Sequence, residues 1–125
     1  DQATAAVHCV VLGDGDGEPR WSLAHRVSRG VPTQFCRVNG AASLMQRALH
    51  RAAWVTTRRR VWTALAESHR AFWRDDCWSV RPDRRIVSES GGRGAEGLAV
   101  ALGEIIRDSG DASVVVMPSD IFVAD

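Results

Sequence analysis

Short apolar runs separated by amphipathic stretches are the feature of this 125-residue chain that most restricts its fold. Two of the runs, residues 7–12 and 114–117, have the length of a buried strand and stop at Gly13 and Pro118. Strands that are apolar without alternation, and so buried on both faces, are typical of parallel sheets covered by helices on both sides. The pattern therefore predicts an α/β fold with three layers.

Helical patterns lie between the apolar runs. Ser43 and Gln46 form a Ser-x-x-Gln capping box, and the residues after it place apolar side chains on one face at i, i+4 spacing. A second apolar stripe covers residues 95–106 and stops before Gly110. The remaining elements are predicted at residues 60–65 (strand), 67–78 (helix) and 85–88 (strand).

Length and composition further restrict the number of domains and the possible partners. The length fits one domain, residues 1–125, built on a mostly parallel sheet of about four strands. The net charge of +1 supplies no strong field toward nucleic acid or an anionic membrane, so we expect neither as a partner. No apolar run has the length of a membrane span, which favours a cytoplasmic protein. All 16 basic residues are arginine, so no lysine is present to clamp a phosphate.

Four motifs accompany these elements in order. They are L-G-D-G-D-G-E-P-R-W-S-L at 12–23, P-T-Q-F at 32–35 with S-L-M-Q at 43–46, E-S-G-G-R-G-A at 89–95, and V-M-P-S-D at 116–120. In this order and spacing the chain resembles the sugar-phosphate nucleotidyltransferases, most closely the mannose-1-phosphate guanylyltransferases, whose motifs are L-A-G-G-x-G-T-R-L-W-P-L, P-K-Q-F, S-L-L-Q, E-P-x-G-R-N-T and P-S-D-H. The resemblance covers nearly the whole chain but only the first, nucleotide-binding half of a family catalytic domain.

The resemblance implies a Rossmann-like nucleotidyltransferase half-domain with its ligand at the carboxyl edge of the sheet. It also assigns roles to particular positions: Gln34 to a substrate phosphate and Asp120 to Mg²⁺. Catalysis falls to Arg20, which lies one place after the family's arginine position. The positions that the resemblance assigns to nucleotide binding are Gly13, Gly15, Gly17, Glu89, Gly92 and Arg93. The implied ligand is a nucleotide or a nucleotide-sugar.

Several positions depart from the family motifs. The family arginine and lysine positions hold Pro19 and Thr33, and three carboxylates, those of Asp14, Asp16 and Glu18, enter the glycine-rich loop. Carboxylates repel phosphate, and a threonine hydroxyl carries no charge to attract it. Whether the chain is an enzyme therefore stays open, and we predict a weak or inactive nucleotide binder.

Other interpretations stay open as well. The loop of residues 13–17 also fits a plain acidic surface loop, and Asp120 also fits a turn at a strand end. A parallel sheet of this size exposes strand edges, which favour pairing with another chain. We therefore expect a homo-oligomer or a partner chain over the open edge. The alternative function is a structural or regulatory oligomerising subunit that binds no ligand.

Overall fold

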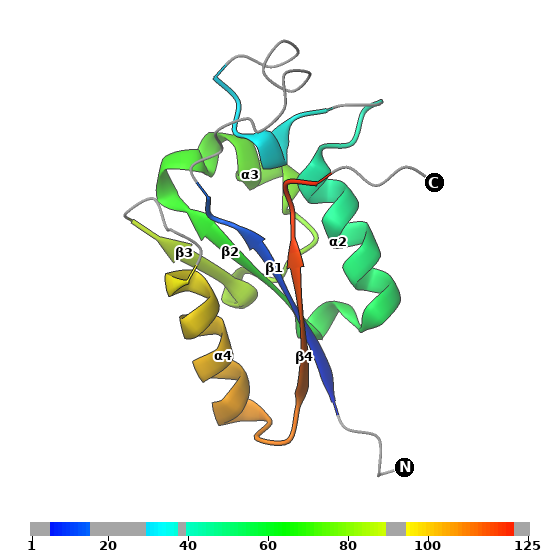
Figure 1. Ribbon diagram of the computed structural model, residues 1–125, viewed down its shortest axis with the longest axis vertical. Helices are drawn as coiled ribbons and strands as arrows, with labels where there is room; N and C mark the ends of the chain where they lie inside the picture. Colours follow the sequence, from blue (N-terminus) through cyan, green and yellow to red (C-terminus); the bar gives the residue numbers. More distant parts are fainter. Residues whose placement is uncertain (1–5, 16–29, 38–39, 90–94, 122–125) are drawn as a thin grey trace.

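A computed structural model describes residues 6–15, 30–37, 40–89 and 95–121 of the chain. Its sheet has the order β3-β2-β1-β4, and each neighbouring pair of strands is parallel (Figure 1). The predicted α/β fold with a parallel sheet of about four strands is confirmed. The strands are β1 (Val7–Gly13), β2 (Val61–Ala66), β3 (Arg85–Ser88) and β4 (Ser113–Pro118).

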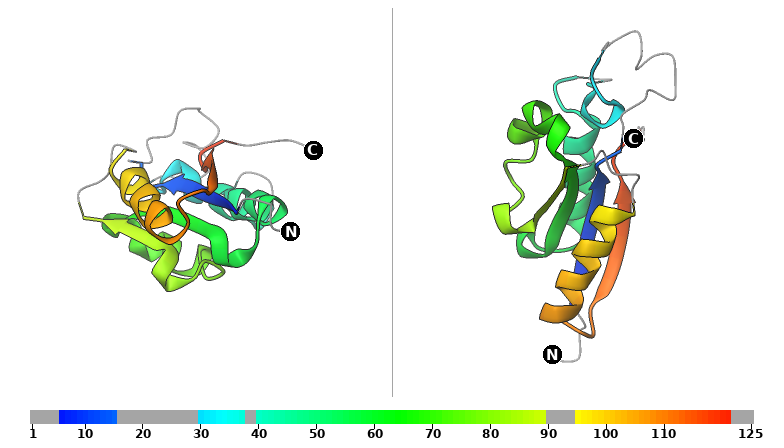
Figure 2. Two further views of the ribbon diagram at one scale, coloured as in Figure 1. Left: turned by 90° about the horizontal axis from the view of Figure 1, so that it is seen from below. Right: turned by 90° about the vertical axis from the view of Figure 1, so that its left-hand side faces the viewer.

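Helices cover both faces of this sheet, which gives the predicted three layers (Figure 2). Helices α2 (Leu44–Val55) and α3 (Arg70–Asp76) pack on one face, and α4 (Glu96–Asp108) packs on the other. None of the helices in the described ranges is both long enough and apolar enough to span a bilayer. Among the described residues, short 3-10 turns connect the elements at Thr33–Phe35, Arg58–Arg60, Glu67–His69 and Pro82–Arg84.

The two central strands explain why the layers form. Cys9 and Val11 of β1 point into the larger core beneath α2 and α3, whereas Val10 between them points into the smaller core beneath α4. All six residues of β2 are buried as well. Because β1 and β2 are apolar on both faces, they are stable only when helices shield each side from water.

The start of α2 follows from its sequence. The hydroxyl of Ser43 accepts a hydrogen bond from the backbone N–H of Gln46 (3.1 Å), and the Gln46 side chain accepts one from the Ser43 N–H (2.9 Å). This is the predicted capping box, which satisfies two N–H groups that lack partners inside the helix. Beyond the other end, the Thr56 hydroxyl donates to the Val7 carbonyl at 2.5 Å and joins the helix to the start of β1.

Three details of the prediction are wrong. The run at residues 114–117 is not buried on both faces, because β4 is an edge strand and leaves Val115 and Val116 36% and 43% exposed. An apolar run indicates a strand, but it does not indicate whether another strand pairs with it on each side. The helix expected at residues 67–78 is a 3-10 turn followed by the shorter α3, and β2 spans residues 61–66 rather than 60–65.

A buried histidine links the two central strands of the sheet. His8 of β1 is 3% exposed, and its Nδ1 accepts a hydrogen bond from the indole N–H of Trp62 at 3.0 Å. Burial lowers the pKa of His8 below its usual 6.5, the charges of Arg60 and Arg84 lower it further, and Asp108 opposes them. The neutral ring, protonated at Nε2, is therefore the form that the fold uses.

We expect this contact to make stability depend on pH. Since the pKa of His8 is lower in the folded state, the unfolded state binds more protons below about pH 6.5, and folding stability falls as pH falls through that range. His8→Gln should flatten the fall in melting temperature between about pH 7.5 and about pH 5.5. Exposed His50 provides the control, His50→Gln. An identical slope in wild type and His8→Gln would contradict this account.

Candidate functional site

The carboxyl ends of β1 and β4 bring two of the sequence motifs together. Leu12 pairs with Pro118 in the parallel register, so the residues that follow each strand leave from the same edge of the sheet. The Ser119 hydroxyl donates to the Leu12 carbonyl at 2.5 Å and holds the two strand ends together. Gly15 and the partly buried Asp120, more than a hundred positions apart, therefore leave from one edge, where open α/β sheets place their ligands.

Gln34 fixes the chain as it leaves β1. Its side chain is 2% exposed, and its Nε2 donates to the carbonyl of Gly13 at 3.0 Å and to that of Gly15 at 3.4 Å. The turn at Thr33–Phe35 thereby holds the first residues of the glycine-rich loop against the sheet. Sequence reasoning assigned Gln34 a phosphate contact and missed this positioning role; the phosphate contact stays a prediction.

Packing requires glycine at position 13 of the loop but not at position 15. A Cβ atom on Gly13 would lie 2.2 Å from the terminal methyl of Met45 and 3.2 Å from the carbonyl oxygen of Ala64. Gly13 therefore lets α2 pack closely on the end of β1. A Cβ atom on Gly15 would meet nothing within 4 Å, so packing leaves room for a side chain there.

Asp14, between these glycines, does not lie where the sequence suggested. It is 1% exposed, and its Oδ2 atom has no hydrogen-bond partner among the described residues. That oxygen faces the first turn of α4, 3.0 Å from where a Cβ of Gly97 would lie. Burial raises the pKa of the Asp14 carboxyl, a hydrogen bond from its own backbone lowers it, and Glu96 raises it again.

The other predicted residues are placed in part. Exposed Glu89 follows β3 at the same edge of the sheet, with β2 between its strand and β1. In the described ranges no three His, Cys, Asp or Glu side chains gather as a metal site, and Mg²⁺ binding by Asp120 stays a prediction. The remaining predicted site residues lie outside the described residues: Gly17, Arg20, Gly92 and Arg93.

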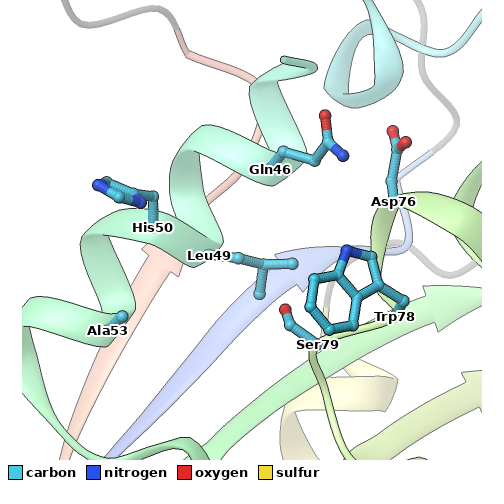
Figure 3. A pocket seen from close by; sticks show the side chains of 7 residues that line it. All are labelled: Gln46, Leu49, His50, Ala53, Asp76, Trp78 and Ser79. Atoms are coloured by element: carbon cyan, nitrogen blue, oxygen red, sulfur yellow. The ribbon is translucent and has the colours of Figure 1, made fainter. Parts of the chain in front are cut away.

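A separate cleft of about 360 Å³ lies between α2 and the segment that follows α3 (Figure 3). The indole of Trp78, 69% exposed, forms part of its wall. The Asp76 carboxylate also lines it and forms an ion pair with Arg37 at 2.9 Å. Of the residues predicted for nucleotide binding, those that the structure describes do not line this cleft. Its lining residues are Gln46, Leu49, His50, Ala53, Asp76, Trp78 and Ser79.

Comparison with known proteins supports the resemblance found in the motifs. No family model matches the chain. The xanthan biosynthesis protein XanB from two strains of Xanthomonas campestris pv. campestris is 29% identical over 118 residues, which is 93% of this chain. The chain spans about a quarter of the length of these relatives, 24%.

A solved structure has the same fold. It is described as mannose-1-phosphate geranyltransferase from Thermus thermophilus, and it superposes with a TM-score of 0.75 and 23% identity over 95% of this chain and 33% of its own. The fold of this chain is thus that of the matching part of the solved structure, a parallel sheet between two helical layers. The resemblance to sugar-phosphate nucleotidyltransferases that the motifs carry is confirmed.

The approach of α4 to the sheet edge depends on Gly97. A Cβ atom there would lie 2.8 Å from the Cβ of Ala64 and 3.0 Å from the Asp14 carboxylate. Overpacking of this kind costs about 1–3 kcal/mol, which exceeds the gain of about 1 kcal/mol in helix propensity. We expect Gly97→Ala to lower the free energy of unfolding in urea by about 1 kcal/mol.

Gly103 is the matched control for that measurement. It lies in the same helix with open space around its Cβ position, so Gly103→Ala should raise the free energy of unfolding by about 0.5–1 kcal/mol. The two substitutions make the same chemical change with opposite expected signs. A Gly97→Ala protein as stable as Gly103→Ala would show that α4 does not press on the sheet edge as described.

Proposed function

We propose that the carboxyl edge of the sheet binds a nucleotide or a nucleotide-sugar in the cytoplasm, with weak or no nucleotidyl transfer. The observation that carries this proposal is the pair of hydrogen bonds from Gln34 to the carbonyls of Gly13 and Gly15. They hold the start of a glycine-rich loop at the edge where Asp120 also lies. Loops of small residues at strand ends allow backbone N–H groups to approach a phosphate closely.

The names of the similar proteins define which ligands to test first. The solved structure is described as acting on mannose 1-phosphate, and the XanB relatives as acting in xanthan biosynthesis. Together with the guanylyltransferase-like motifs, these names favour GTP and GDP-mannose as ligands. In this proposal Arg20, Gly17, Gly92 and Arg93 complete the site.

The charges at this edge argue for weak transfer. At about 5 Å and an effective dielectric of about 20, one carboxylate opposes one phosphate charge by about 3 kcal/mol, and solvent reduces that figure. Asp14 places such a charge at the edge, and Thr33 stands where the family has lysine. Mg²⁺, held by Asp120 together with a ligand phosphate, would supply charge neutralisation.

An added charge in the loop tests the proposed site. Gly15→Asp should fold normally because the Cβ position is open, and its carboxylate should repel the diphosphate of GDP-mannose. We expect the dissociation constant for GDP-mannose, measured by calorimetry, to rise at least about tenfold. The matched control, Gly103→Asp, adds the same charge to an open position of α4. Equal affinity of wild type and Gly15→Asp for GDP-mannose would contradict this site.

A second candidate function rests on the exposed strand β4. It lies at the edge of the sheet and exposes Val115 and Val116, and such an edge is ready to pair with another strand. The alternative proposal is a structural or regulatory subunit whose β4 edge pairs with a second copy or with a partner chain, without ligand binding.

Light scattering after gel filtration tests this candidate. We expect a dimer at high protein concentration, and Val116→Asp should shift it toward monomer because it puts a charge on an exposed apolar position of the edge strand. Asp111→Asn, a charge change at an exposed turn residue outside β4, is the control. A clean monomer at every concentration would contradict self-association, and a thermal shift with GDP-mannose would contradict a purely structural role.

A further inference from the structure

We propose that Asp14 is an internal anion, seated against the first turn of α4, that keeps ligand phosphate groups out of that place and so favours ligands with few phosphate charges. This inference rests on the proposed function, because it concerns the selectivity of the same edge of the sheet. It goes beyond that function by assigning to one side chain the choice between ligands of different charge.

The geometry places the carboxylate where an external anion would otherwise bind. Helix α4 follows β3, so its amino end lies at the carboxyl edge of the sheet, beside the loop after β1. The first N–H groups of a helix have no partners within it, and together with the helix dipole they attract anions. Ala95, which precedes α4, provides no side-chain cap for these groups.

The burial of Asp14 gives the second, independent observation. Its side chain is 1% exposed, its Oδ2 has no hydrogen-bond partner among the described residues, and that oxygen points at Gly97 of this first turn. Burial raises the pKa of this carboxyl, and the amino end of α4 is a described feature that favours its charged form. The absence of a Cβ on Gly97 lets the oxygen approach the helix backbone.

In this position Asp14 selects ligands by their charge rather than by their shape. A phosphate that approached the amino end of α4 would meet the Asp14 carboxylate already in place, and Glu96 in the same turn adds a second negative charge. The uncharged base and ribose of a nucleoside meet no such repulsion. Affinity should therefore fall as the number of phosphate charges on the ligand rises.

Calorimetry on four proteins tests the inference: wild type, Asp14→Asn, Asp14→Gly and the control Asp111→Asn. Asp14→Asn keeps the shape of the side chain and removes its charge, and Asp14→Gly also empties the space. The probes are inorganic tripolyphosphate, GTP and guanosine. Melting temperatures of each variant establish that it is folded before its affinities are compared.

We expect both Asp14 variants to bind tripolyphosphate and GTP about tenfold more tightly than wild type, with guanosine unchanged and Asp111→Asn like wild type. If neither folded variant gains affinity for tripolyphosphate, the inference is overturned. If wild type binds GTP as tightly as Asp14→Asn, the nucleotide site stands and the inference falls. A third outcome separates the inference from the proposed function. In it the Asp14 variants gain affinity for tripolyphosphate, but none of the four proteins binds guanosine, and none binds GTP more tightly than tripolyphosphate. The inference would then stand, and the proposed nucleotide function would fall.

Discussion

The parallel pairing of β1 with both β2 and β4 is the constraint on which the rest of this structure depends. Parallel pairing sends the carboxyl ends of all the strands to one edge, so residues 13–15 and 119–120 meet there although most of the chain separates them. It also requires each connection to cross a face of the sheet; α2 and α3 cover one face, and α4 covers the other. The three layers and the candidate site are two consequences of the same pairing.

Close packing at that edge limits what the candidate site can do. Gly13 admits the side chain of Met45 from α2, and Gly97 brings α4 against Ala64 from the opposite face. Between these approaches the Asp14 carboxylate is enclosed instead of exposed. The edge thus combines a strand end held by the Gln34 side chain with a buried carboxyl group, and this combination is why we infer binding with weak transfer.

Much of the fold could be predicted from local sequence. The capping box at Ser43 and the apolar run of β1 are determined by neighbouring residues, so their patterns were sufficient. The motifs also located the edge where Asp120 lies. The burial of Asp14 and the hydrogen bonds of Gln34 depend on segments that meet only after folding, and no local pattern reports them. The exposure of β4 was missed for the same reason, since it depends on the missing neighbour of an edge strand.

The most direct test of the central claim is a titration of the isotope-labelled protein with GDP-mannose, in which NMR chemical shifts of the backbone amides are measured at each ligand concentration. The account predicts that the amides of Gly13, Gly15 and Asp120 shift together with one dissociation constant, while those of His50 and Trp78 beside the cleft in Figure 3 do not. Shifts confined to the cleft, or no shifts at all, would contradict a nucleotide site at the carboxyl edge of the sheet.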